Sequence, residues 1–336
     1  MIVNRLAWIA LVSLIFLVVA GAVVRVTGSG LGCPDWPTCW GCLIPPTSAD
    51  QIDVAKLDLE KFKTHAARKG IDPDTITRDT VLDSFDPVHT WIEFTNRLAT
   101  MPLGFATLLL VLFSFGAKRN RAWIVGLAVF GLLDVVANAI MGAMVVRSGL
   151  QPGVITLHMA LAFLLIAVLV TIIWLSRRET LDSGSSCSQQ KRLKLVSVVF
   201  VVCLFSEGLL GSQLREQTDE LAITAETDQG VKREKWGEEL AATIIYKIHR
   251  SFSWSLLLTS GLLLLCAKGE KSLRALEPEL IFTMVVAMML MGIVLGHIAI
   301  YPVVQVLHVG MTAVLLAVTW HWIMRLWSSS PVVQPD

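Results

Sequence analysis

Residues 151–158 read QPGVITLH, and residues 300–308 read IYPVVQVLH. Each stretch opens a long apolar run, and in each a proline stands six residues before the histidine. The two histidines, His158 and His308, are 150 residues apart. An ionisable side chain inside hydrocarbon is costly, so the same histidine in the same local frame twice predicts a duplicated cofactor or ion site.

The composition around these stretches is that of a membrane protein. Of the 336 residues, 54% are hydrophobic and 16% are charged, and several apolar runs reach the roughly 18 residues that a spanning helix needs. A net charge of +1, without a basic patch carrying interleaved aromatic residues, gives no indication of a nucleic-acid partner. We predict an all-α integral membrane protein with eight transmembrane helices, at residues 5–26, 88–116, 121–146, 152–176, 193–215, 241–266, 279–300 and 303–327.

Short basic segments predict the orientation of these helices. Four such segments fall on one side of the predicted membrane, and the positive-inside bias assigns that side to the cytoplasm. Both termini then lie on the cytoplasmic side, and two long polar segments, 27–87 and 216–240, lie outside. The four basic segments are 118–121, 177–178, 191–194 and 268–274.

The repeat extends to the other helices. Each half holds four of them, and because four is even, the second half starts in the same direction as the first. We predict two parallel-repeat four-helix bundles, residues 1–178 and 193–336, joined by a cytoplasmic linker, 179–192. The matched residues are Gly142 with Gly292, Asn96 with His249, Arg97 with Arg250, Gly21 with Gly211 and Arg25 with Arg215.

Two histidines in the C-terminal half predict an iron cofactor. His249 and His308 are placed about six to nine residues into their helices, so both lie at similar depth near the outer face. Side chains from facing helices of a bundle can clamp a cofactor, and two imidazoles with an arginine beside one of them suit a six-coordinate haem. The alternative is a histidine that bonds only to a backbone carbonyl or a nearby serine; the matched pair favours haem.

The N-terminal half differs chemically from its twin. Asn96 stands where the C-terminal half has a histidine, and Glu93 lies one turn earlier on the same face. We expect the C-terminal half, which has two histidines and no acid, to hold a cofactor, and the N-terminal half to perform proton chemistry. The alternative for Glu93 is an ion pair with Arg97 at i, i+4. His89, four residues before Glu93, is a candidate for the missing nitrogen ligand.

Three cysteines lie in the 27–87 segment. Two of Cys33, Cys39 and Cys42 could form a disulfide in an oxidising outer compartment, with Cys33–Cys39 the first choice and the pairing left open. The CxxC of residues 39–42 has no second CxxC to complete a structural zinc site, so we do not expect metal there.

A run at residues 25–39, RVTGSGLGCPDWPTC, the EFTNR segment at 93–97 and the three histidines together resemble the haem A synthase family (CtaA/Cox15 type). The match spans all eight predicted helices. This resemblance implies an oxidoreductase that converts a methyl group of haem O to the formyl group of haem A for terminal oxidase assembly. Family members commonly carry E-x-x-H-R where this chain has E-x-x-N-R, with Asn96 in the ligand position.

The resemblance also implies roles for single residues. His249 and His308 are the axial ligands of a haem b cofactor, His158 is an axial ligand of the substrate haem, and Glu93 is the essential acid. Cys33 and Cys39 match the family's outer-loop cysteine pair, with Cys42 as a third cysteine that leaves the pairing open, and the family's second cysteine pair has no counterpart in residues 216–240. The propionate groups have four candidate partners, Arg25, Arg97, Arg215 and Arg250.

Further expectations concern partners, location and rival functions. Besides haem O and membrane lipid, haem O synthase (protohaem farnesyltransferase) is a candidate partner; the electron acceptor is not identified. A bacterial plasma membrane is favoured over the mitochondrial inner membrane because no arginine- and serine-rich presequence precedes the first helix. The alternatives are a di-haem cytochrome b-like electron carrier without chemistry of its own, and a transporter with a protonatable His/Glu pathway.

Overall fold

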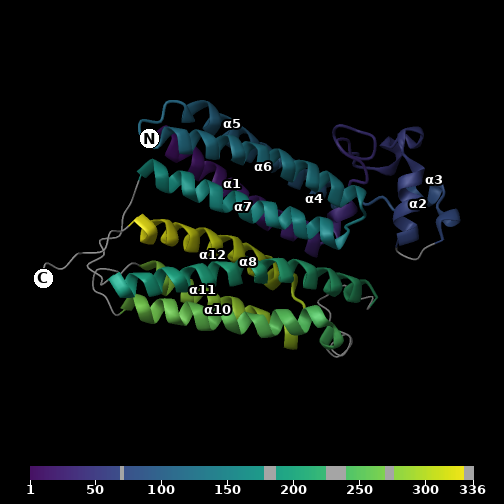
Figure 1. Cartoon of the computed structure of the whole chain (residues 1–336). Helices are drawn as coiled ribbons and strands as arrows, with labels where there is room; N and C mark the ends of the chain where they lie inside the picture. The colour runs from purple at the N-terminus through teal and green to yellow at the C-terminus, as the bar shows by residue number, and fades with distance from the viewer. Residues whose placement is uncertain (69–71, 178–186, 225–239, 269–275, 329–336) are drawn as a thin grey trace, which may run out of the picture.

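The computed structural model describes residues 1–68, 72–177, 187–224, 240–268 and 276–328 (Figure 1). In this part of the chain every regular element is a helix, apart from an isolated β-bridge between Cys39 and Cys42. Eight helical segments are long and apolar enough to cross a membrane, which confirms the predicted number. The spanning segments are formed by α1 (Ile2–Val26), α4 (Pro87–Leu98) with α5 (Thr100–Ser114), α6 (Arg121–Arg147), α7 (Pro152–Arg177), α8 (Cys187–Thr224), α10 (Ile244–Lys268), α11 (Leu276–His297) and α12 (Pro302–Ser328).

The prolines of the repeated motif are helix starts. Pro152 opens α7 and Pro302 opens α12. Proline is favoured in the first turn because its missing N–H would have no intrahelical acceptor there. Each start places its histidine six residues further on, about 9 Å along the helix axis at 1.5 Å per residue. The proline therefore sets the depth of His158 and His308.

Two boundaries differ from the predicted spans. The predicted helix 88–116 is one span made of two helices, α4 and α5, which meet at Ala99. Pro102 explains the break, because it cannot donate the N–H that an unbroken helix would give to the carbonyl of Leu98. Helix α8 runs on to Thr224, so the first residues of the predicted loop 216–240 are helical; residues 225–239 lie outside the described residues.

The spanning helices form two groups. In the N-terminal half, α1, α5, α6 and α7 each pack against the next and α7 packs back against α1. In the C-terminal half, α8, α10, α11 and α12 close a second ring in the same way. Between the halves α7 packs on α12, α1 on α12 and α7 on α8. In Figure 1 α1 begins and α12 ends at the same end of the molecule.

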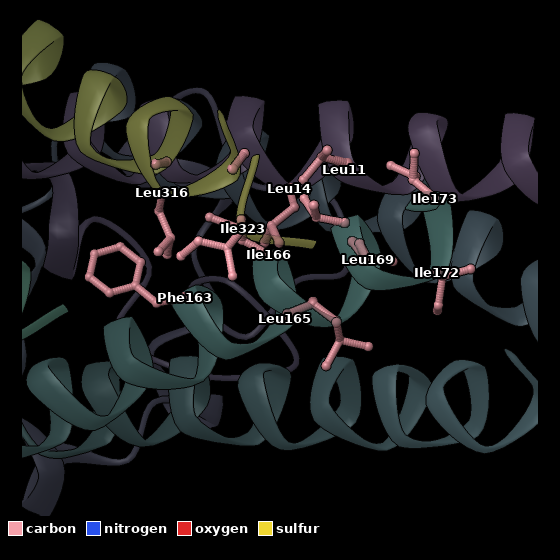
Figure 2. Close-up of a cluster of buried hydrophobic side chains, with 14 of the residues drawn as sticks. Leu11, Leu14, Phe163, Leu165, Ile166, Leu169, Ile172, Ile173, Leu316 and Ile323 are labelled. Carbon is pink, nitrogen blue, oxygen red and sulfur yellow. The ribbon is translucent and has the colours of Figure 1, made fainter. Parts of the chain in front are cut away.

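Large aliphatic side chains fill the contact between the halves. Figure 2 shows Leu11 and Leu14 of α1, Ile166 of α7, and Leu316 and Ile323 of α12 in one buried cluster. Each buried leucine or isoleucine is less than 10% exposed. One continuous core therefore joins the two bundles and fixes how they face each other.

The 27–87 segment forms a small unit at the end of the helices opposite the N-terminus (Figure 1). Trp40 lies at its centre and stacks edge-on against Phe85, with ring centroids 5.2 Å apart. The Trp40 indole donates to the carbonyl of Gly32 (2.8 Å) and to the hydroxyl of Thr90 in α4 (3.1 Å), so the unit is tied to the second span. Its helices are η1 (Ser29–Leu31), η2 (Ala49–Gln51), η3 (Val54–Lys56), α2 (Leu59–Arg68), η4 (Pro73–Thr75) and α3 (Arg78–Asp83).

Candidate functional site

The three predicted histidine ligands occupy equivalent places. His158 lies in α7, His249 in α10 and His308 in α12, each within the first two turns of its helix. Their rings are largely shielded, and the Nδ1 atom of each is buried without a hydrogen-bond partner among the described residues. Buried polar nitrogens are almost always satisfied in folded proteins. Protein groups do approach these rings: Glu207 Oε1 lies 3.2 Å from Nδ1 of His249, and backbone groups of α6 and α11 lie near the other two rings. Such contacts orient one edge of an imidazole and leave its second nitrogen to bind a metal.

His249 and His308 lie on two diagonal helices of the C-terminal bundle. Helices α10 and α12 lie diagonally, since α8 and α11 each pack against both of them. The two imidazoles are close enough to interact electrostatically. Two neutral imidazoles from opposite helices are the donor set of a six-coordinate haem, so these residues fit the predicted cofactor.

The surroundings of His158 and His308 match at the level of single contacts. The His158 ring meets the backbone of Asn138 in α6, and the His308 ring meets the backbone of Met288 in α11. Each of these partners lies 20 residues before its histidine. The spacing found in the sequence thus recurs as the same contact between helices.

Glycines of neighbouring helices make room for two of the rings. A Cβ atom added at Gly142 would lie 3.7 Å from Cε1 of His158, and one added at Gly211 would lie 3.4 Å from Cε1 of His249. At both positions an alanine Cβ would be in ordinary van der Waals contact with the imidazole, so each ring packs closely against the neighbouring helix. Gly292, the repeat partner of Gly142, has open space around it instead.

Glu93 is buried, with 6% of its surface exposed, and forms the ion pair considered from the sequence. The Nε of Arg97 donates to its Oε1 at 3.1 Å. The rest of the same guanidinium donates to three backbone carbonyls of the 27–87 segment, those of Cys33 (2.9 Å), Asp35 (2.9 Å) and Thr38 (3.0 Å). Arg97 therefore connects the buried carboxylate to the loop outside the membrane.

The remaining N-terminal candidates are placed as follows. Asn96 is half-buried three residues after Glu93, and its Oδ1 is buried without a hydrogen-bond partner among the described residues. His89 is exposed in the first turn of α4, where its backbone N–H donates to the capping carboxylate of Asp86 at 3.1 Å. That backbone bond lowers the pKa of Asp86, whose side chain lies outside the membrane-spanning segment.

The loop cysteines are paired as first expected. Cys33 and Cys39 form a disulfide, and Cys42 is a free thiol opposite Cys39 in the β-bridge. Among the described residues no group of three or more His, Cys, Asp or Glu side chains is placed to hold a metal ion.

The other arginines lie near the same end of the helices. Arg25 is half-buried in the last turn of α1, and Arg215 ends the apolar part of α8. Arg250 follows His249 in α10 and is exposed. Their contact with propionate groups stays a prediction.

The expectation that the C-terminal half has no acid is wrong. Glu207 of α8 is buried, with 6% exposed, and its Oε1 lies 3.2 Å from Nδ1 of His249. The hydroxyl of Ser253 in α10 donates to the same oxygen. The signal was visible in the sequence as a lone glutamate inside the apolar run of the fifth span, but aligning the halves on their histidines passed over it.

A second buried acid was also missed. Asp134 lies midway along α6 with 5% exposed, and its Oδ2 is buried without a hydrogen-bond partner among the described residues. The amide of Asn138, one turn further on, donates to its backbone carbonyl at 3.2 Å.

Comparison with known proteins gives this arrangement a family. The family model described as "COX15-CtaA: Cytochrome oxidase assembly protein" matches residues 4–320. The chain belongs to this family. It is therefore a multi-pass membrane protein, in agreement with its eight apolar helices.

Curated relatives carry the name "Heme A synthase". The chain is 27% identical to that of Shewanella oneidensis over 225 residues, which cover 66% of this chain and 60% of the relative. It is 28% identical to that of Methylobacterium sp. strain 4-46 over 217 residues, covering 62% and 56%. These two matches span less than two thirds of the relatives' own length. The match to the enzyme of Sphingopyxis alaskensis, 27% identical over 359 residues, covers 98% of this chain and 93% of the relative.

Proposed function

We propose that this protein is a haem A synthase, an integral-membrane oxidoreductase that converts the methyl group of haem O to the formyl group of haem A for terminal oxidase assembly. The observation that carries this proposal is the unequal equipment of two similarly built bundles. One offers two imidazoles on diagonal helices, with a glutamate beside one of them, and the other offers a single imidazole and a glutamate that pairs with an arginine. Several relatives named "Heme A synthase" support the same activity.

The C-terminal bundle, residues 193–336, is the proposed cofactor half. His249 and His308 would hold a haem b, which when bound supplies one-electron redox chemistry. Their shielded positions on diagonal helices and their electrostatic interaction support this ligand pair. Guanidinium groups pair well with carboxylates, so Arg215 and Arg250 of this half, and Arg25 and Arg97 of the N-terminal half, are proposed as propionate partners.

The N-terminal bundle, residues 1–178, is the proposed substrate half. His158 would bind the iron of haem O as an axial ligand, and Glu93 would serve as the catalytic acid and base. Turning a methyl group into a formyl group removes four electrons and four protons and adds the oxygen of water. A buried carboxylate near the ring provides the proton acceptor that this stoichiometry requires.

Asn96 makes the proposed substrate site differ from the common family pattern. An amide oxygen replaces the second imidazole of the common E-x-x-H-R pattern, and that oxygen is buried without a protein partner in the described residues. We propose that substrate iron is held firmly by His158 alone, with Asn96 on the other side. His89, exposed at the start of α4, is the weaker candidate for that side.

The proposed setting is a cell membrane, with that of bacteria favoured, and with both termini on the cytoplasmic side. The two bundles are proposed as parallel repeats, which the matched contacts of His158 and His308 support. The 27–87 segment then lies outside, where an oxidising compartment suits the Cys33–Cys39 disulfide. Haem O synthase is proposed as the neighbour that supplies the substrate.

The decisive experiment expresses the chain in cells that make haem O but lack their own haem A synthase. We expect haem A in the extracted haems, identified by chromatography, and a low-spin haem b spectrum in the purified protein. Purified protein with haem in both halves but cells without haem A would point to a di-haem electron carrier. Protein without any haem absorbance would point to a transporter.

A further inference from the structure

Glu207 and Ser253 form a polar cluster beside His249 that the proposed reaction does not use. Glu207 belongs to α8, while Ser253 lies one turn after His249 in α10. The Ser253 hydroxyl donates to Glu207 Oε1 and lies 2.8 Å from the carbonyl oxygen of His249. The other carboxylate oxygen, Oε2, is buried without a hydrogen-bond partner among the described residues.

The carboxylate of Glu207 approaches the Nδ1 edge of His249, which leaves Nε2 for iron. Oε1 of Glu207 lies 3.2 Å from Nδ1 of His249, within ion-pair distance but off the axis of the ring N–H. With Nδ1 directed at α8, Nε2 lies on the far side of the ring, where a metal can bind it.

Burial strengthens the contact between Glu207 and His249. A carboxylate with 6% of its surface exposed has lost nearly all its water, so it depends on the neighbours that remain. The Ser253 hydroxyl donates to Oε1, and Nδ1 of His249, 3.2 Å away, is the second polar atom beside this oxygen. Metal-bound histidines usually donate their second N–H to a carboxylate or carbonyl, which fixes the tautomer and makes the ligand more basic.

A carboxylate at the position of Glu207 occurs only in the half that has the second imidazole. Glu207 stands four residues before Gly211, and the matching residue before Gly21 is Leu17. Asn96 stands in the place of His249, and Thr100 in the place of Ser253. The N-terminal counterpart of the cluster therefore lacks both the carboxylate and the imidazole. The carboxylate and the second imidazole are either both present or both absent in a half, as expected if the carboxylate positions the imidazole.

We infer that Glu207 is a positioning residue for His249, which accepts its Nδ1 proton, directs its Nε2 to the bundle interior and lowers the reduction potential of the haem held there. This inference rests on the proposed ligation by His249 and His308. A more basic imidazole and a nearby negative charge both favour ferric over ferrous iron. Ser253 secures the carboxylate in this position.

Two variants of Glu207 separate its charge from its hydrogen bond. Glu207→Gln keeps the size and one acceptor oxygen but removes the charge, whereas Glu207→Leu removes both. We expect the midpoint potential of the C-terminal haem to rise in Glu207→Gln, and to rise further in Glu207→Leu with about tenfold to 100-fold weaker haem retention. The low-spin ferric EPR signal should shift with the changed ligand basicity and ring orientation.

Matched controls lie in the same half. Glu279→Gln removes a carboxylate that is exposed in the first turn of α11, and it should leave potential and EPR signal unchanged. Ser253→Ala should raise the potential by less than Glu207→Gln. The Ser255 hydroxyl donates to the carbonyl of Phe252 in its own helix, so Ser255→Ala should leave the potential unchanged.

The outcomes separate this inference from the proposed function. A wild-type protein without bis-imidazole haem would remove the function on which the inference depends. A wild type with that haem, and a Glu207→Gln variant with the same potential and EPR signal, would overturn the role of Glu207 alone. If Glu207→Gln does not accumulate in membranes, Ser253→Ala decides by the same two measurements, and unchanged values would overturn the inference.

Discussion

Glu93 and Glu207 are both glutamates buried near the same end of their bundles, but their partners belong to different parts of the molecule. Glu93 pairs with Arg97, whose guanidinium also holds three carbonyls of the 27–87 segment. Glu207 lies beside His249 and is held by Ser253 within the helices. Glu93 is thus connected to a loop beyond the helices, whereas Glu207 is connected to a histidine within them. Two bundles of one plan can therefore divide proton chemistry from cofactor binding.

Substitution of the histidines in the C-terminal half should have the largest effect. His249→Ala or His308→Ala should abolish haem binding there, because one imidazole cannot supply both axial ligands. Visible spectra of the purified variants, with quantification of extracted haem, measure the loss. His297→Ala, which alters an exposed histidine at the end of α11, is the matched control. Full haem content in both His249→Ala and His308→Ala would contradict the ligand assignment.

The next test removes the acid of the N-terminal half. Glu93→Gln should reduce haem A formation by at least about 100-fold, because proton transfer by a positioned side chain contributes that much or more. The C-terminal haem spectrum should persist, since Glu93 lies in the other bundle. Chromatography of cellular haems gives the yield, and Glu60→Gln in the exposed face of α2 is the control. An undiminished yield would exclude Glu93 from the reaction.

Substitution of Arg97 tests the connection between Glu93 and the 27–87 segment. Arg97→Ala leaves Glu93 buried without its ion-pair partner and frees three loop carbonyls, so we expect a destabilisation of about 3–5 kcal/mol. Thermal unfolding in detergent measures it, and faster proteolysis within the 27–87 segment should accompany it. Arg78→Ala, at an exposed position of α3, should be nearly neutral. Equal stability of the two variants would show that the connection contributes nothing.

The disulfide should have the smallest of these effects. It joins residues six apart in sequence, and the chain-entropy estimate for such a short loop is roughly 2 kcal/mol. Cys33→Ser should lower the unfolding temperature under non-reducing conditions, and a reductant should lower that of the wild type in the same way. Cys42→Ser, which alters the free thiol nearby, should not. If Cys42→Ser is the destabilising change, the pairing differs from that in the structure.

The apolar runs made the helices predictable. A span needs only enough consecutive apolar residues, and that is a local property of the chain, so all eight were found. The break at Ala99 is local as well, since Pro102 is visible in the sequence, although the prediction drew one helix there. Cys33 and Cys39, being close in sequence, had few other partners to choose from.

Contacts between distant residues were less accessible. Arg97 binds the carbonyl of Cys33, which lies 64 residues earlier, and no periodicity in the sequence signals such a contact. Glu207 was visible as a charge within an apolar run, but its role depends on which face of α8 meets α10. That face is decided by packing against several helices at once.

By itself the sequence determined the number of spans and the residue types available in each half, because hydrophobic length and composition are properties of the chain alone. Only the tertiary structure decided which buried charge meets which partner. In a membrane every helix surface is largely apolar, so the pattern of one helix leaves its rotation open. Packing between the bundles fixed that rotation, and with it placed Glu93 against Arg97 and Glu207 against His249.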